Sequence, residues 1–154
     1  MNTQFNSKHL ALLKDIRRCL EGHFQQDTAY PGTQSQVASA GHCAIVSAIT
    51  ALTVGGTLAS TKFNGVSHWF NRLFDGQQWW DIDLTGDQFG LPAIQVTPAG
   101  KLYSATAVQP LAALNSETLQ RALVLAGRSG ISTAVEPLRR LLMTRQADEQ
   151  AIHV

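Results

Sequence analysis

The chain has 154 residues and a net charge of +1, and 44% of its residues are hydrophobic while 15% are charged. A chain of this length is expected to form a single domain, 1–154, and its composition excludes intrinsic disorder. It contains no basic run long enough to follow a phosphate backbone, and no stretch approaches the roughly 20 apolar residues of a membrane span. We therefore expect neither a nucleic acid nor a membrane as a partner.

The first residues and the cysteines bear on cellular location and on metal binding. No apolar stretch of the kind found in signal peptides opens the chain, so we expect a cytoplasmic protein, or one exported without a cleavable signal peptide. Cys19 and Cys43 are too few for a disulfide framework, and no Cys-x-x-Cys or His-x-x-x-His spacing indicates a metal site. We expect no metal, no cofactor and at least one free thiol.

Residues 7–24 predict an amphipathic helix, because apolar side chains recur there at spacings of three and four. Cys19 falls on the apolar stripe, where a free cysteine is most often a small buried hydrophobe, so it is not the candidate nucleophile. The stripe consists of Leu12, Leu13, Ile16, Cys19, Leu20 and His23.

A loop over residues 27–42 is predicted to lead into a second helix that begins near Cys43. The loop contains Pro, Gly, Ser and Thr without hydrophobic periodicity. Residues 43–54 are apolar nearly all round and end at Gly55-Gly56, which predicts a buried helix with a glycine at its C-terminal cap.

A β-hairpin is the clearest local prediction. Residues 66–74 and 77–84 are typical of strands, and Asp75-Gly76 between them is the dipeptide that most strongly indicates a two-residue turn. Short strands or turns are expected over residues 85–105. A helix that opens at Asn115-Ser116-Glu117, with Asn115 or Ser116 as its N-cap, runs to about Ala126. A helix over residues 133–146 and a frayed tail over 147–154 complete the chain.

Cys43 is the candidate nucleophile. A cysteine attacks as the thiolate, and the unpaired N–H groups and dipole of a helix N-terminus favour negative charge. Gly41 would allow a substrate to approach the backbone closely, and the N–H of Cys43 could contribute to an oxyanion hole.

The hairpin predicts the partner of this thiol. A two-residue turn at Asp75-Gly76 would pair Phe74 with Gln77 and hence His68 with Asp83, so that a carboxylate could orient an imidazole across the strands. Asp81 lies on the same face and is the alternative orienting residue, since a wider turn would favour it.

The same register predicts one face for the core and one face for a cleft. Phe70 and Trp79 share the face of His68 and are candidate substrate contacts, although aromatic residues in a hairpin are more often packing residues. His42 is a further candidate because it neighbours the nucleophile. Without Cys43, a hydrogen-bonded pair of His68 and Asp83 would be interpreted as structural.

A set of short motifs resembles the YunG-like family of small bacterial proteins. The resemblance runs from about Leu10 to Arg128, which defines a predicted catalytic core of about 10–128 and leaves 130–154 as a helical extension. The motifs are Asp27-Thr28-Ala29, Gly41-His42-Cys43-Ala44, Gly55-Gly56, Ser67-His68-Trp69-Phe70-Asn71-Arg72-Leu73, Asp75-Gly76 and Asp83-Leu84-Thr85-Gly86-Asp87-Gln88-Phe89.

More distantly, the order of Cys43, His68 and Asp83 resembles that of transglutaminases, arylamine N-acetyltransferases and papain-like enzymes. This resemblance implies an α+β fold in which a central helix with cysteine at its N-terminus packs on a small antiparallel sheet, with flanking helices. The family usually has a glutamine just before the cysteine, where it contacts the oxyanion of the substrate. This chain has His42 at that position, and Gln34 or Gln36 upstream could supply the contact to substrate instead.

The expected function is that of a cysteine-dependent hydrolase (a protease, amidase or deamidase). Cys43 would attack an amide of a peptide, a protein or a small molecule, His68 would act as acid and base, and Asp83 would orient His68. The alternatives are an acyltransferase or transglutaminase with an amine acceptor, and an inactive binding module of the same fold.

Overall fold

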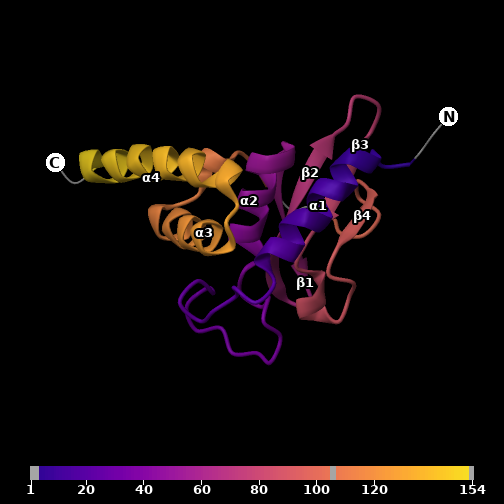
Figure 1. Cartoon of the computed structure of the whole chain (residues 1–154), viewed down its shortest axis with the longest axis horizontal. Helices are drawn as coiled ribbons and strands as arrows, with labels where there is room; N and C mark the ends of the chain where they lie inside the picture. Colours follow the sequence, from indigo (N-terminus) through magenta and orange to yellow (C-terminus); the bar gives the residue numbers. More distant parts are fainter. Residues whose placement is uncertain (1–3, 105–106, 153–154) are drawn as a thin grey trace.

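The computed structural model describes residues 4–104 and 107–152 and shows an α+β fold. An antiparallel sheet with the strand order β4-β3-β2-β1-β5 lies on one side of the molecule, α3 and α4 lie on the other, and α2 runs between them (Figure 1). In chain order the elements are α1 (Ser7–Leu20), α2 (Cys43–Val54), β1 (Thr57–Phe63), β2 (Val66–Phe74), β3 (Trp79–Asp83), η1 (Gly86–Phe89), β4 (Gln95–Pro98), β5 (Ala107–Gln109), η2 (Leu111–Ala113), α3 (Ser116–Ser129) and α4 (Ser132–Ile152).

Helix α2 is the central element, and its predicted bounds are confirmed. All of its side chains from Ile45 to Ala51 are buried, because β2 packs on one side of the helix and α1, α3 and α4 pack on the others. Such a helix is apolar all round since no side of it faces water. Gly55 closes it with a positive φ of 94°.

Helix α1 crosses one face of the sheet (Figure 1) and is shorter than predicted. Asn6 caps it by accepting hydrogen bonds from the N–H groups of Lys8 and His9. Leu13, Ile16 and Leu20 are buried as the stripe predicts, whereas Leu12 of the same predicted stripe is 40% exposed. The helix ends at Leu20 and not at residue 24, because the backbone is already extended at Glu21, with a ψ of 134°, and Gly22 then adopts a positive φ of 81°. Cys19 is partly buried against the core.

The predicted register of the β2–β3 hairpin is wrong by two residues. Phe74 pairs with Trp79 and not with Gln77, because Asp75 organises a longer turn in which its carboxylate accepts hydrogen bonds from the N–H groups of Gln77 and Gln78. The indole N–H of Trp80 donates to the same carboxylate at 2.7 Å. A shift of two residues keeps every side chain on its predicted face of the sheet.

Strand β1 was not predicted from the sequence. It follows Gly55-Gly56 and pairs with β2 on one side and with β5 on the other, which makes it a central strand of the sheet. Its side chains at Leu58 and Ala59 are fully buried on opposite faces of the sheet, the first in the main core and the second in a smaller cluster with Phe70 and Tyr103.

The C-terminal helices extend further than predicted. Helix α3 begins after the Asn115 cap as expected and continues to Ser129. The segment expected to fray is helical up to Ile152, and Ser116 donates to Glu149 at 2.6 Å, which ties the end of α4 to the start of α3. Residues 153–154 lie outside the described part. In the described residues, no helix has both the length and the apolar character needed to cross a membrane.

The turn between α2 and β1 contains two glycines, of which only the second lies close to the backbone of β2. Gly55 and Gly56 have φ values of 94° and 92°, but a Cβ on Gly56 would lie 2.7 Å from the carbonyl oxygen of Arg72, while one on Gly55 would meet only Leu73 at 3.8 Å. We expect Gly56→Ala to lower the free energy of unfolding by more than the ~1–3 kcal/mol of backbone strain alone. Urea denaturation measures this loss, with Gly55→Ala as the matched control. Equal losses would contradict a clash with β2.

Candidate active site

The site begins with a buried hydrogen bond between β2 and β3. Nε2 of His68 lies 2.8 Å from Oδ2 of Asp83, and both side chains are almost completely buried. They are not direct cross-strand neighbours, because the register pairs Asn71 with Ile82 and Asp83 itself pairs with Gln95 on β4. The contact is therefore diagonal, and it forms because the two-residue shift leaves both side chains on one face.

The carboxylate of Asp83 is held from several sides. The hydroxyl of Tyr103 donates to Oδ2 at 2.7 Å, and the N–H and hydroxyl of Thr85 donate to Oδ1 at 2.9 Å and 3.3 Å. A buried carboxylate needs such donors, and here they also fix the orientation of the group.

The alternative orienting residue, Asp81, is engaged elsewhere. Its carboxylate forms a bidentate ion pair with Arg72, its direct cross-strand partner, and accepts a hydrogen bond from the N–H of Gly100. The structure thus places Asp83, and not Asp81, against His68.

Cys43 is the first residue of α2 and is partly exposed. Burial lowers the pKa of His68, but hydrogen bonds to Asp83 and to the Cys43 thiol, together with their charges, raise it to about 9. The Cys43 thiol is therefore close enough to the imidazole to raise its pKa, and a protonated imidazole is the state that stabilises a thiolate.

The register between α2 and β2 fixes this juxtaposition. The side-chain amide of Asn71 donates to the carbonyl oxygen of Ser47 at 2.8 Å in a buried hydrogen bond. Because Ser47 lies one turn after Cys43, this contact holds the start of α2 at a set height along β2. Near the second ring nitrogen of His68, Nε2 of Gln88 lies 3.4 Å from Nδ1.

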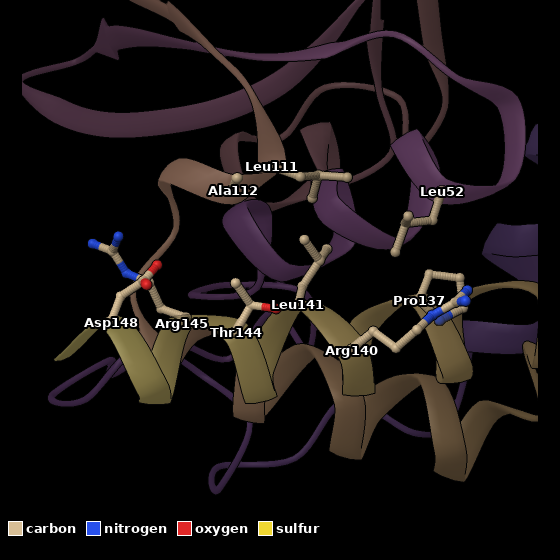
Figure 2. A pocket seen from close by; sticks show the side chains of 9 residues that line it. All are labelled: Leu52, Leu111, Ala112, Pro137, Arg140, Leu141, Thr144, Arg145 and Asp148. Carbon is tan, nitrogen blue, oxygen red and sulfur yellow. The ribbon is translucent and has the colours of Figure 1, made fainter. Parts of the chain in front are cut away.

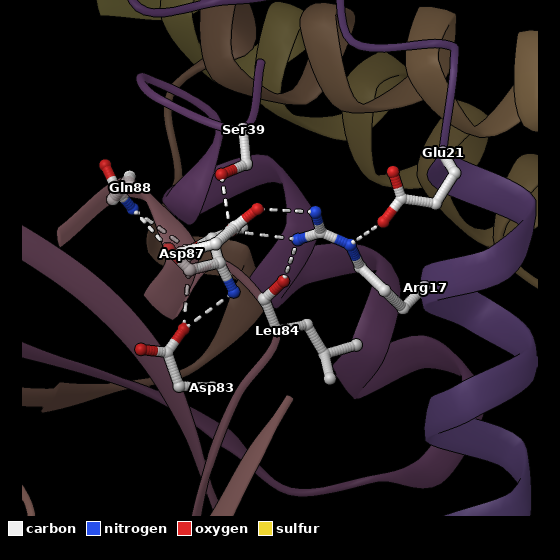
Figure 3. Close-up of polar contacts among 8 residues, drawn as sticks. Arg17, Glu21, Ser39, Asp83, Leu84, Asp87 and Gln88 are labelled. Carbon is white, nitrogen blue, oxygen red and sulfur yellow. Dashed lines mark hydrogen bonds and ion pairs between the residues drawn. The ribbon is translucent and has the colours of Figure 1, made fainter. Parts of the chain in front are cut away.

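A buried arginine ties the surrounding segments together (Figure 3). Arg17 of α1 donates to the carbonyl of Leu84 at 2.6 Å and forms an ion pair with Asp87 of η1 at 2.7 Å. Asp87 in turn accepts a hydrogen bond from Ser39 at 2.6 Å. The loop before Cys43 and the turn after Asp83 are therefore joined through one carboxylate. Burial raises the pKa of Asp87, but the hydrogen bonds from Arg17 and Ser39 outweigh this effect and lower it.

The four residues predicted to contact substrate, Phe70, Trp79, His42 and Gln36, lie in different surroundings in the structure. Phe70 is fully buried against Tyr103, and Trp79 is half exposed at the turn end of β3, where it packs on Phe74. About 13 Å of strand separates Trp79 from Asp83 at ~3.3 Å per residue.

The other two predicted contacts lie in the loop before α2. His42 is buried, donates from Nδ1 to the carbonyl of Ala40 at 3.0 Å and lies 2.9 Å from the hydroxyl of Thr28. Burial lowers the pKa of His42. Gln36 is exposed in this loop. The His42 side chain therefore contacts Phe24, Thr28 and Ala40 within the segment before α2, whereas Gln36 faces solvent.

Comparison with known proteins identifies a family. A family model described as YunG protein matches residues 12–125. The chain belongs to the YunG family. No curated protein and no solved structure matches it. The YunG match contains Cys43, His68 and Asp83, whereas α4 lies beyond its end.

A cavity of about 410 Å³ lies between α4, η2 and the end of α2 (Figure 2). Figure 2 shows Leu52, Leu111 and Leu141 pointing into it, and Arg140 and Arg145 at its edges. None of Cys43, His68 and Asp83 lines this cavity, and α4 supplies much of its wall outside the YunG match. It is therefore separate from the candidate active site.

Several residues of the site were not predicted from the sequence, although all lie within the YunG match. Tyr103 comes from an irregular segment and Gln88 from the single-turn helix η1, where no periodicity indicates which side chains turn inward. Arg17 did leave a signal, because it stands among Leu13, Ile16 and Leu20 on the apolar side of its helix. A charged residue in such a position is rarely buried without a partner.

The raised pKa of His68 predicts a pH-dependent stability. A proton bound with a folded pKa of about 9 against an ordinary 6.5 stabilises the folded state fully below pH 6.5, and this contribution is lost as the pH rises through 9. We expect the free energy of unfolding to fall by up to about 3 kcal/mol over this interval. Urea denaturation at several pH values measures it, with His68→Gln as the reference. A wild-type curve parallel to that of His68→Gln would contradict the raised pKa.

Proposed function

We propose that the protein is a cysteine-dependent hydrolase that cleaves amide bonds, with Cys43 as nucleophile, His68 as acid and base, and Asp83 as the residue that orients His68. The observation that carries this proposal is the position of the His68 imidazole, which is hydrogen-bonded to Asp83 at 2.8 Å and whose pKa is raised by the neighbouring Cys43 as well as by Asp83. A histidine between a carboxylate and a cysteine is the arrangement that nucleophilic catalysis by a thiol requires.

The proposed reaction has two steps. The Cys43 thiolate attacks the amide carbonyl, a C–S bond forms, the C–N bond breaks, and the proton on His68 passes to the leaving amine. His68 then takes a proton from water, whose oxygen attacks the thioester; the C–S bond breaks, and the carboxylic acid leaves as the Cys43 thiolate and the protonated His68 are restored.

The N-terminus of α2 supports stabilisation of the oxyanion. His42 precedes the helix, and its side chain makes no capping hydrogen bond, so it does not occupy the first N–H groups of α2. These groups have no partner within the helix. The N–H of Cys43 is thus our candidate for the donor that stabilises the tetrahedral intermediate.

The fold is compatible with the papain-like and transglutaminase-like arrangement that the sequence resembles. In both, the nucleophile lies at the start of a central helix, and the histidine and its partner lie on neighbouring antiparallel strands. We propose this relationship from the order of Cys43, His68 and Asp83 and from the packing of α2 on β2. Peptides, protein side-chain amides and small amides are the substrate classes that follow from it.

Alkylation distinguishes the two cysteines. Cys43 lies at a helix N-terminus beside a protonated imidazole, whereas Cys19 lies on the core side of α1, so iodoacetamide should modify Cys43 at least about tenfold faster at neutral pH. Peptide mapping by mass spectrometry measures both rates in one sample. Equal rates, or faster modification of Cys19, would remove the nucleophile assignment and leave a binding module as the function.

Substitution of two equally buried aspartates distinguishes a role in orienting His68 from a role in stabilising the fold. Asp83 and Asp81 are each 2% exposed and lie on the same strand, but only Asp83 contacts His68. We expect Asp83→Asn to lower kcat for hydrolysis of fluorogenic peptide amides by roughly 10²–10⁴-fold, because the imidazole loses the group that fixes its tautomer.

The matched Asp81→Asn variant should lose stability through its ion pair with Arg72 and retain kcat when assayed below its melting temperature. A thermal melt of each variant checks the first point. If Asp83→Asn is as active as wild type, Asp83 is not the orienting residue.

A further inference from the structure

Arg121 of α3 faces the loop that leads to Cys43. One end of its guanidinium group donates to the carbonyl oxygen of Thr28 at 3.3 Å, and the other donates to the hydroxyl of Thr118, also at 3.3 Å. The group lies over the ring of Tyr30, with 5.7 Å between Cζ and the ring centroid. Arg121 is itself only partly exposed.

A short chain of contacts links this cation to the nucleophile. Thr28, which accepts from Arg121, also places its hydroxyl 2.9 Å from Nε2 of His42, and His42 directly precedes Cys43. The electrostatics agree with this geometry, because the charge of Cys43 acts on Arg121 and the charge of Arg121 acts on His42. Arg121 and Cys43 are therefore close enough for their charges to interact.

Arg121 differs from the other arginines that hold this loop. Arg17 is paired with Asp87, and Arg128 is paired with Asp27 through two short hydrogen bonds. Within residues 4–104 and 107–152, by contrast, no carboxylate forms an ion pair with Arg121, and its partners are a carbonyl, a hydroxyl and an aromatic ring.

The cation is also poorly solvated. Burial lowers the pKa of Arg121, and the charges of Glu117, Tyr30 and Cys43 offset this effect only in part. A partly buried guanidinium without an ion-pair partner retains the fork of donors that binds a carboxylate, and binding one would compensate for the desolvation.

We propose that Arg121 is a specificity-determining residue that binds a carboxylate of the substrate near the reacting carbonyl, so that the enzyme prefers anionic amides, such as peptides with an acidic residue or a free C-terminus beside the scissile bond. This proposal rests on the proposed function only in taking Cys43 as the reactive thiol. The alternative role for Arg121 is structural, as an anchor between α3 and the loop before α2.

Two alkylating reagents of different charge test the proposal without a known substrate. Iodoacetate carries a carboxylate and iodoacetamide does not, so the ratio of their rates at Cys43 reports whether a nearby cation attracts anions. We divide this ratio by the same ratio for free N-acetylcysteinamide. In wild type the normalised ratio should be about fivefold above one at low ionic strength and should decline as salt is added.

Substitutions assign the effect to one residue. Arg121→Gln should lower the normalised ratio and leave only what the protonated His68 contributes, and Arg121→Lys should keep most of the preference. Arg128→Gln is the matched control, because it removes an equal charge from the same helix and another anchor of the same loop, and it should leave the ratio unchanged. A loss in Arg128→Gln equal to that in Arg121→Gln would show that loop anchoring is responsible and would overturn the proposal.

The outcomes for the two proposals are separable. If Cys43 reacts no faster than Cys19 with iodoacetamide, the nucleophile assignment fails whatever the ratio. If Cys43 reacts fast but the wild-type ratio is one or lower, the hydrolase proposal stands and the role of Arg121 fails. Should Arg121→Gln not fold, the wild-type ratio and its salt dependence, together with Arg121→Lys, still decide the question.

Discussion

Helix α2 imposes the main constraint on this fold, because an element that is apolar on every side has to be covered on every side. The sheet covers one side and the remaining helices cover the others, so the layers in Figure 1 follow from the burial of residues 45–51. The buried hydrogen bond from Asn71 to Ser47 then sets where the helix stands along β2. A contact of this kind contributes only about 1 kcal/mol, but leaving either group unpaired would cost more, so it specifies position as well as stability.

Three arginines hold the long loop that precedes Cys43. Arg17, Arg121 and Arg128 each reach the long loop between α1 and α2 or the segments it touches, and they come from helices on two sides of it. The loop carries no regular structure of its own, so these contacts replace the backbone ladder that a strand or helix would provide. The residues just before Cys43 are thereby held by side chains from distant parts of the chain.

Local sequence patterns predicted much of this molecule, and the limits of the prediction have physical causes. The bounds of α2 and the cap of α3 follow from nearest neighbours in the chain, and so does the presence of the hairpin. The register of that hairpin depends on the side chain of Asp75, which competes with the two-residue turn. Tyr103 reaches Asp83, and Arg121 reaches the loop before α2, through tertiary packing, which no local periodicity records. Phe70 was assigned to a cleft that Tyr103 fills.

The diagonal contact between His68 and Asp83 has a consequence for how this hairpin can vary in length among related chains. Where a change in turn length shifts the register, an even number of residues slides one strand along the other but leaves His68 and Asp83 on a common face. An odd insertion or deletion would send Asp83 to the opposite face, toward the main core, and would bring its apolar neighbour Ile82 toward His68. Length polymorphism at this turn should therefore occur in steps of two wherever the histidine and aspartate are both retained.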